Sequence, residues 1–300
     1  MSENVLSRRT AVTAGVALAC TAAAAGACAP KAQAAESDPK PVILVVSFGT
    51  SYNDSRHITI GAIEDAIREK YPEYDVRRAF TAQIIIDKLA ERDGITIDNF
   101  EDAMDKIVAD GVKTLIVQPT HLMAGHEYTD VYNSLQNYAD KFDSVILGDP
   151  LLTSDDDYEA VANAIVDATA KYDDGQTAIC FMGHGTDADS NEDYTKMQEV
   201  LTNDGHTSYF VGTVEATPTF DDVVSAAQEA GYTKAVLRPL MVVAGDHANN
   251  DMADETDPES FASKFIAAGF EVTSVIEGLG QLVAIDDIYV QHVADAIALL

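Results

Sequence analysis

The chain has 300 residues, 47% of them hydrophobic and 23% charged, which is the composition of a globular protein with one large domain or two moderate ones. Its 19 Lys and Arg residues are outnumbered by 50 Asp and Glu residues, and the net charge of −31 offers no basic surface to nucleic acid or anionic lipid. Three Cys residues are too few for a disulfide scaffold. These features exclude nucleic-acid binding and docking on anionic membranes as the main function.

Residues 1–35 have the features of an export signal. Arg8 and Arg9 precede a weakly apolar run rich in Ala and Gly, and a small-residue cleavage site follows at Ala34. This pattern predicts a twin-arginine signal that directs the protein to the periplasm or the cell envelope. Two alternatives stay open, an uncleaved membrane anchor and lipid attachment at Cys28.

Apolar runs and helical patterns alternate through the rest of the chain. A continuous apolar run over residues 42–48 ends at Gly49 and is typical of a strand buried on both faces. Further runs of this kind lie at residues 113–117, 143–147, 177–182, 208–214, 234–241 and 271–276. Apolar residues at helical spacing predict helices over 100–108, 158–166 and 285–300. The alternation predicts an α/β fold with parallel sheets.

The chain also repeats itself. Gly49-Thr50 recurs 136 residues later as Gly185-Thr186, and the order of the surrounding predicted strands agrees. The repeat predicts two similar α/β halves, residues 36–152 and residues 153–300. The acidic segment 153–157 is the predicted link between them, and its Asp run is equally suited to capping the next helix.

Three residues with metal-binding side chains lie at or just beyond the ends of predicted strands in the second half, namely His184, Glu215 and His247. The carboxyl ends of parallel strands form the ligand-binding edge of an open sheet. Two imidazoles and a carboxylate suit Zn, Co, Fe or Ni and leave coordination positions for a substrate. Taken singly, His184 is explained as a turn cap and Glu215 as neutralising local dipoles. Three such residues on successive strand ends favour a metal site.

Four segments resemble those of the small class II chelatases, specifically the anaerobic-type sirohydrochlorin cobaltochelatases. They are residues 46–51 (VSFGTS), 183–186 (GHGT), 214–218 (VEATP) and 239–251 (PLMVVAGDHANND). The resemblance extends over about residues 42–297. It implies two Rossmann-like halves, each a parallel sheet flanked by helices, with a tetrapyrrole held in a cleft between them.

The resemblance also assigns roles within the predicted site. It implies that His184 is the base and a metal ligand, and that Glu215 and His247 complete the metal site. The implied metal is Co²⁺, with Fe²⁺ or Ni²⁺ as alternatives. The residues predicted to bind the substrate are Ser47, Phe48, Gly49, Thr50, Ser51, Arg56, His121, Met123 and His126. For His121 and His126, binding of an additional metal or haem is an alternative.

The first half is expected to bind the tetrapyrrole without binding the metal. The repeat aligns Phe48 with His184 and Phe80 with Glu215, so aromatic rings replace the metal ligands there and are predicted to offer stacking surface. The substrate of this family carries many carboxylates, and nearby cations must offset the acidity of the chain. The candidate cations are Arg56, Arg78 and Arg238, which lie near predicted strand ends.

Two functions from different classes follow from these features. The first is an exported chelatase that inserts a divalent metal into sirohydrochlorin or a related tetrapyrrole. The second is an exported carrier of metal, tetrapyrrole or haem built on the same fold. The three intact metal-binding residues favour the enzyme, whereas the export signal favours the carrier, because tetrapyrrole synthesis is expected inside the cell. A homo-oligomer is compatible with either function.

Overall fold

The computed structural model describes residues 39–300. The predicted export signal, its cleavage site and Cys28 therefore lie outside the described residues. Strands and helices alternate along the described chain, as the sequence predicts. Within residues 39–300, none of the helices combines the length and the apolar character needed to cross a membrane.

The first half is built on a parallel sheet of four strands in the order β2-β1-β3-β4. The strands are β1 (Val42–Ser47), β2 (Asp75–Phe80), β3 (Thr114–Pro119) and β4 (Ser144–Leu147). The helices are α1 (Asn53–Ile58), α2 (Ile60–Lys70), α3 (Gln83–Asp93), α4 (Phe100–Ala109) and α5 (His126–Gln136), with a 3-10 turn at Ala139–Lys141. Every residue of β1 is buried, as its unbroken apolar run predicts for a strand inside a sheet covered on both faces.

The second half repeats this plan with the strand order β6-β5-β7-β8. The strands are β5 (Thr177–Gly183), β6 (Tyr209–Thr213), β7 (Lys234–Pro239) and β8 (Glu271–Ser274). The helices are α6 (Asp155–Thr169), α7 (Glu192–Asn203), α8 (Phe220–Glu229), α9 (Phe261–Ala267) and α10 (Val283–Ile297). Short 3-10 turns lie at Ala170–Tyr172, Asp189–Asn191 and Leu279–Gln281, and a π-helical turn, η4, at Ala248–Met252. The identical strand orders confirm the prediction of two similar α/β halves.

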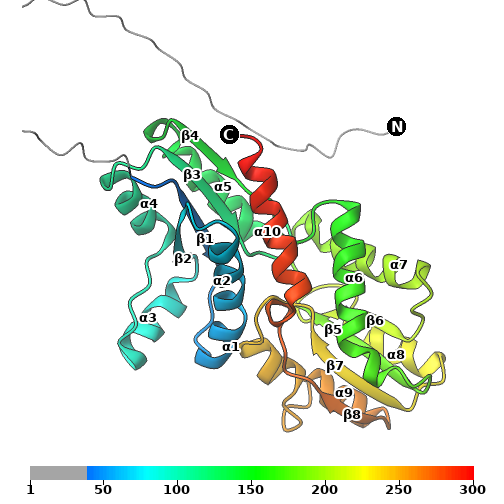
Figure 1. The fold of residues 1–300 in the computed structure, drawn as a ribbon. Helices are drawn as coiled ribbons and strands as arrows, with labels where there is room; N and C mark the ends of the chain where they lie inside the picture. Colours follow the sequence, from blue (N-terminus) through cyan, green and yellow to red (C-terminus); the bar gives the residue numbers. More distant parts are fainter. Residues whose placement is uncertain (1–38) are drawn as a thin grey trace, which may run out of the picture.

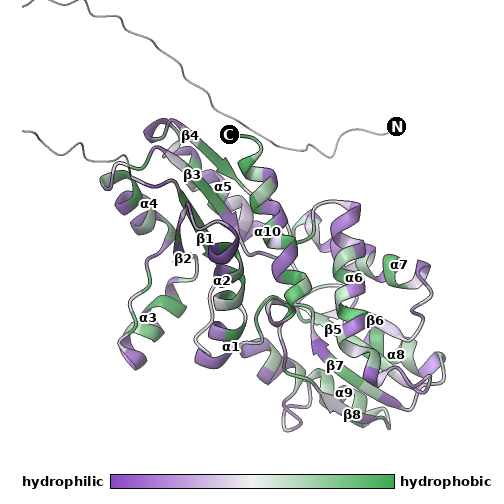
Figure 2. Cartoon of the chain, viewed as in Figure 1, coloured by the Kyte–Doolittle hydropathy of each residue, from purple (hydrophilic) through white to green (hydrophobic). Residues whose placement is uncertain are grey.

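The last helix, α10, joins the two halves. It packs against α2, β3 and β4 of the first half and against α6 of the second. Figure 1 shows it in red between the two sheets, and Figure 2 shows hydrophobic residues along much of its length. Its buried face belongs to one hydrophobic cluster that also contains Ile43 and Ile67 of the first half and Phe181 of the second. The hydroxyl of Tyr289 donates to the carbonyl oxygen of Thr120 at 3.0 Å. The halves therefore share part of their core.

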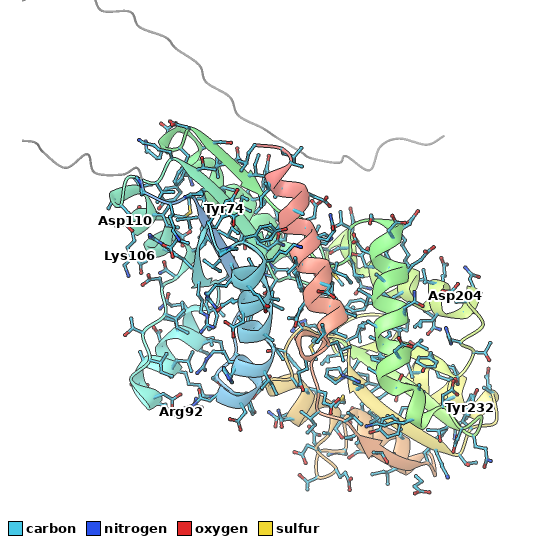
Figure 3. The ribbon with its side chains drawn as sticks, in the orientation of Figure 1. Tyr74, Arg92, Lys106, Asp110, Asp204 and Tyr232 are labelled. Atoms are coloured by element: carbon cyan, nitrogen blue, oxygen red, sulfur yellow. The ribbon has the colours of Figure 1, made fainter. Side chains whose placement is uncertain are left out.

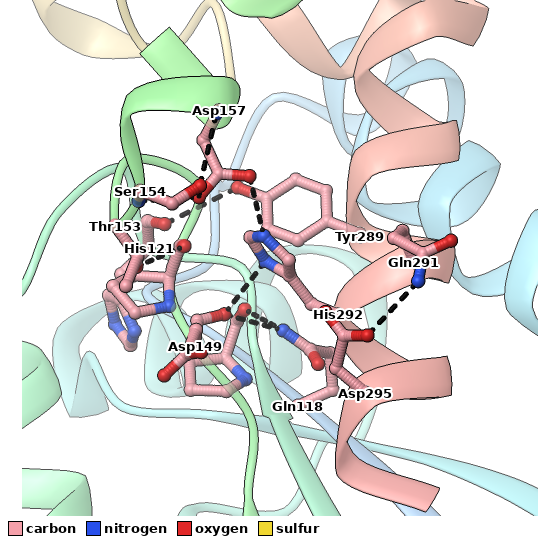
Figure 4. A network of polar contacts seen from close by, with 12 residues as sticks. Gln118, His121, Asp149, Thr153, Ser154, Asp157, Tyr289, Gln291, His292 and Asp295 are labelled. Carbon is pink, nitrogen blue, oxygen red and sulfur yellow. Dashed lines mark hydrogen bonds and ion pairs between the residues drawn. The ribbon is translucent and has the colours of Figure 1, made fainter. Parts of the chain in front are cut away.

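His292 of α10 contacts two segments, the loop after β4 at Asp149 and the start of α6 at Asp157, as Figure 4 shows. Its Nδ1 lies 3.2 Å from the carbonyl oxygen of Asp149, and its Nε2 lies 3.0 Å from Oδ1 of Asp157. Asp157 also forms a capping box with Ser154 at the start of α6. Burial alone would raise the pKa of Asp157, but the hydrogen bonds from His292 and Ser154 outweigh burial and lower it. Because this pKa is depressed, the contact stabilises the fold at neutral pH and is lost as the pH falls through the acidic range.

Replacing Asp157 by Ala should therefore cost more than the loss of a helix cap. The second half offers a matched control in α8, where Thr219 and Asp222 form the same capping box. Loss of a cap costs about 1 kcal/mol, and a hydrogen bond to a charged group adds about 1.5–3 kcal/mol. In urea unfolding at pH 7, we expect Asp157→Ala to lower the free energy of unfolding by about 1.5–3 kcal/mol more than Asp222→Ala. Equal losses would show that His292 adds nothing to the capping box.

Candidate active site

His184 is the first residue after β5, and a glycine-dependent turn fixes its position. Its Nδ1 lies 2.9 Å from the carbonyl oxygen of Gly185. Since a carbonyl only accepts, Nδ1 carries the hydrogen and Nε2 keeps its lone pair. Gly185 has a φ of +88°, and a Cβ added there would lie 2.8 Å from the backbone nitrogen of Ala216. Glycine at this position lets the loop of His184 approach the loop of Glu215.

Glu215 lies beside His184 because backbone pairing continues beyond the strands. Its N–H donates to the carbonyl oxygen of His184 at 2.9 Å. Its Oε2 lies 3.9 Å from Nδ1 of His184, and the two side chains are 58% and 44% exposed. A carboxylate and an imidazole are thus accessible together at the ends of β6 and β5.

His247 completes the group from the loop that follows β7. Its ring centroid lies 4.5 Å from that of His184, and the two ring planes are perpendicular. Its Nδ1 lies 2.7 Å from Oδ2 of Asp251. The strands β5 and β7 are the neighbours at which the strand order reverses, where open α/β sheets bind their ligands. The structure therefore brings the three sequence-predicted residues together.

The three side chains gather without enclosing an ion. Over residues 39–300, no group of three or more His, Cys, Asp or Glu side chains is arranged to hold a metal ion as it stands. The ligand roles of His184, Glu215 and His247 remain predictions.

The end of β1 offers one exposed ring to a ligand. Among the five predicted substrate-binding residues 47–51, Phe48 is 47% exposed, whereas the others are buried. The prediction that Phe80 stacks on the ligand is wrong, because Phe80 is fully buried. Its ring packs against Gly49, where a Cβ would lie 2.5 Å from the ring. The sequence repeat aligned Phe80 correctly with a strand end but could not tell which way its side chain points.

Two arginines support the loop that follows β1. Arg56 is buried and donates to the carbonyl oxygen of Thr50 at 3.4 Å, and burial followed by the charge of Arg78 lowers the pKa of Arg56. Arg92, near the end of α3 (Figure 3), donates to the carbonyl oxygen of Ser51 at 2.5 Å. Arg56 thus holds the loop through a buried hydrogen bond to its backbone. A contact between its guanidinium and a substrate carboxylate remains a prediction.

The other two candidate cations are paired inside the protein. Arg78 donates to both carboxylate oxygens of Glu64, at 2.6 and 2.7 Å. Arg238 is 1% exposed and lies 3.3 Å from the carboxylate of Glu277. Arg78 therefore neutralises the buried carboxylate of Glu64, and the buried guanidinium of Arg238 pairs with a half-exposed carboxylate. The sequence did not indicate these pairs because the partners are distant along the chain.

The predicted residues that follow β3 differ in exposure. His121 has shielded ring nitrogens with no hydrogen-bond partner in the described chain, and burial lowers its pKa to about 4. Met123 is 8% exposed and packs in the core that the halves share. His126 is exposed, and its Nε2 lies 2.6 Å from Oδ1 of Asp187 in the second half. Their contacts with a substrate, an additional metal or haem remain predictions.

The halves meet beside the candidate site through the loops that carry its histidines. Asp187, which contacts His126, lies three residues after His184. On the loop of His247, Asp246 accepts a hydrogen bond from the hydroxyl of Tyr52 at 3.4 Å. Both contacts place residues of the first half next to the loops that carry His184 and His247.

A cavity of about 520 Å³ lies elsewhere, at the edge strand β2. It is lined by Glu64, Arg68, Val76, Arg78, Ile95, Thr96, Ile97, Asp98 and Lys106. Its basic residues are paired, Arg78 with Glu64, Lys106 with Asp98, and Arg68 with Asp65. Of the residues predicted to serve the substrate, the cavity contains only Arg78, and its basic lining residues are all paired, so it presents no free cation to an anionic ligand.

Two similar parallel sheets, with two imidazoles and a carboxylate gathered at the strand ends of one sheet beside loops that contact the other half, are the arrangement of a two-half metal chelatase. The chain matches the cobalt chelatase (CbiK) family over residues 41–298 and belongs to that family.

Individual relatives agree with this assignment. The chain is 36% identical over 258 residues to the sirohydrochlorin cobaltochelatase of Salmonella typhimurium, covering 86% of this chain and 97% of that protein. It is 30% identical over 264 residues to the sirohydrochlorin cobaltochelatase CbiKC of Nitratidesulfovibrio vulgaris, covering 87% and 92% of the two chains. The structure of SirB from Bacillus subtilis with Fe³⁺ superimposes with a TM-score of 0.59 at 17% identity, over 87% of this chain and 96% of that one. This likeness confirms the predicted chelatase fold.

Proposed function

We propose that this protein inserts Co²⁺ into sirohydrochlorin. The observation that carries the proposal is the meeting of His184, Glu215 and His247 at three adjacent strand ends, beside loops that contact the first half. The cobaltochelatase relatives, aligned over nearly their whole length, support the same reaction. The carrier function is less well supported, because a carrier has no need of a proton acceptor beside the metal ligands.

The chemistry follows from what metal insertion requires. Two pyrrole N–H groups must lose their protons while the metal exchanges its previous ligands for ring nitrogens. In neutral His184 the hydrogen bond from Nδ1 to a carbonyl leaves one lone pair on Nε2. That lone pair can first hold the metal and, once the metal has moved to the ring nitrogens, accept one pyrrole proton, while the second proton passes to solvent. Glu215 adds a negative charge that stabilises the incoming cation. Phe48 offers an exposed ring on which the macrocycle can stack.

The donor set bears on the choice of metal. Imidazole and carboxylate together suit Co²⁺, Fe²⁺ and Ni²⁺, so the ligands alone allow all three. The naming of the relatives supports Co²⁺ as the substrate metal, with Fe²⁺ and Ni²⁺ as competing ions. Binding of haem at His126 would require its contact with Asp187 to break.

The experiment is an anaerobic insertion assay. Purified protein is mixed with sirohydrochlorin and with Co²⁺, Fe²⁺ or Ni²⁺ in turn, and the absorbance change of the macrocycle is followed. We expect insertion well above the rate without protein, and fastest with Co²⁺. A protein that binds sirohydrochlorin tightly but leaves the uncatalysed rate unchanged would instead be a carrier.

We further propose that the protein is exported through its twin-arginine signal and cleaved near Ala35. The sequence pattern around Arg8, Arg9 and Ala34 supports this proposal. In the native host, the intact mass of protein recovered from the envelope fraction should correspond to a start at Ala35. Changing both Arg8 and Arg9 to Lys should leave full-length protein in the cytoplasm. A mass that includes residues 1–34, or a lipid on Cys28, would contradict cleavage at this position.

A further inference from the structure

Asp251 contacts Nδ1 of His247 and leaves the other ring nitrogen, Nε2, to a metal. Its Oδ2 lies 2.7 Å from Nδ1 of His247. A carboxylate only accepts hydrogen bonds, so this contact requires the hydrogen of the neutral ring to be on Nδ1. The lone pair of His247 is then on Nε2. In unconstrained neutral imidazole side chains the hydrogen favours Nε2, which would leave the opposite nitrogen as donor to a metal.

The local helix explains how the two residues meet. The segment after His247 forms the π-helical turn η4, and turns of this kind are frequent at functional sites. Ala248 and Met252, four residues apart, are both fully buried and anchor this turn in the core of the second half. His247 and Asp251 immediately precede them and have the same spacing. The pair therefore lies together on the neighbouring side of the turn, 37% and 38% exposed.

The two histidines are held by different means. Nδ1 of His184 is fixed by the backbone carbonyl of Gly185, which no substitution removes. Nδ1 of His247 is fixed by a side chain. The rings are perpendicular with centroids 4.5 Å apart, and the acceptor at each Nδ1 leaves the lone pair of the neutral ring on Nε2.

We propose that Asp251 is a positioning residue for cobalt insertion, which holds His247 in the tautomer and orientation that present Nε2 to the metal. This inference rests on the proposed function only in taking His247 as a metal ligand. A partner of this kind typically changes metal affinity or activity by about 10- to 100-fold.

The primary test is Asp251→Ala, with Asp254→Ala as the matched control. Asp254 lies three residues further on, and its carboxylate accepts from Thr256 rather than from a histidine. Both variants remove one negative charge from the same segment, so a general electrostatic effect would appear equally in both. Asp251 is partly exposed, and its truncation leaves no buried cavity. Unfolding midpoints are recorded for both variants.

The first readout is the tautomer of His247, measured without metal by long-range ¹H–¹⁵N correlation NMR on ¹⁵N-histidine protein, with the signal assigned from His247→Ala. Wild type and Asp254→Ala should show the hydrogen on Nδ1, and Asp251→Ala should shift it to Nε2. The signal of His184 should stay the same in all three proteins, because its carbonyl partner is unchanged. An unshifted tautomer in Asp251→Ala would overturn the proposal.

The second readout is Co²⁺ affinity, measured by titration together with kcat and KM for insertion. Asp251→Ala should weaken Co²⁺ binding about tenfold or more and raise KM for the metal, whereas Asp254→Ala should change either by less than about twofold. Equal effects of the two variants would show that Asp251 acts only through its charge and would also overturn the proposal. A wild-type protein without insertion activity would contradict the proposed function, while the tautomer measurement would still decide the role of Asp251.

Discussion

His184→Ala and His247→Ala should each lower the rate of cobalt insertion at least about 100-fold. For His184 the reason is the loss of the proposed general base, and for His247 it is the loss of a proposed metal ligand. The centroids of the two rings lie only 4.5 Å apart. The side chains are 44% and 37% exposed, so truncation opens no cavity in the core. The measurement is the anaerobic insertion rate at saturating Co²⁺, with thermal unfolding of each variant to confirm the fold.

Phe48→Ala is the control from the first half. It removes an exposed ring and no metal-binding atom, so Co²⁺ affinity should persist while sirohydrochlorin binding weakens. If both histidine variants kept activity within about threefold of wild type, neither imidazole would be the base. If Phe48→Ala lost as much Co²⁺ affinity as His247→Ala, the metal would bind elsewhere.

Asp286→Asn should stabilise the protein at pH 8 and leave its stability at pH 4 nearly unchanged. Asp286 is 7% exposed in the first turn of α10, and its Oδ1 has no hydrogen-bond partner among residues 39–300. Burial, with a smaller effect of Asp287, raises its pKa to about 7. An ordinary Asp in the unfolded chain has a pKa of about 3.9.

The sign follows from proton binding. Between pH 4 and pH 7 the folded chain holds a proton on Asp286 that the unfolded chain has released, so stability falls as the pH rises through this range. Asn is neutral throughout and avoids this loss. At pH 8 the gain should be about 2–4 kcal/mol, since one pKa unit corresponds to about 1.4 kcal/mol.

Urea unfolding at pH 4, 6 and 8 measures this effect, with Asp287→Asn as the control. Asp287 is the exposed neighbour and loses the same charge, so its replacement should change stability by only about 0.5 kcal/mol or less. A gain for Asp286→Asn that does not grow with pH would contradict the assignment of a buried, protonated carboxyl group.

Among the strands that the sequence predicted, β1 and β5 have the most continuous apolar runs. Both are buried throughout, and a strand covered on both faces needs such a run. β2 was missed, because Asp75, Arg77 and Arg78 interrupt its apolar residues. In the structure β2 is an edge strand, and its arginines bind carboxylates that lie far along the chain.

The candidate site was predictable because parallel strands bring their carboxyl ends to one edge. That rule is sufficient to group His184, Glu215 and His247, and the repeat supports the order of their strands. The strand-end rule does not show which neighbouring residues orient the imidazoles of His184 and His247. Asp251 was missed, although its spacing from His247 equals that of the apolar pair Ala248 and Met252. Only the π-helical geometry of η4 shows that the spacing produces a contact.

The place of α10 at the end of the chain affects how the protein is made. The last strand of the first sheet, β4, is complete at Leu147, yet Ile67 of α2 packs in a cluster whose other members include Ile288 and Val293. Synthesis runs from the N-terminus, so the apolar face of the first half that α10 covers stays exposed to solvent while the second half is translated. The 15 residues of α10 then close the core of both halves at once. A chain that stops before them keeps an exposed hydrophobic face and is expected to aggregate rather than fold as an independent half.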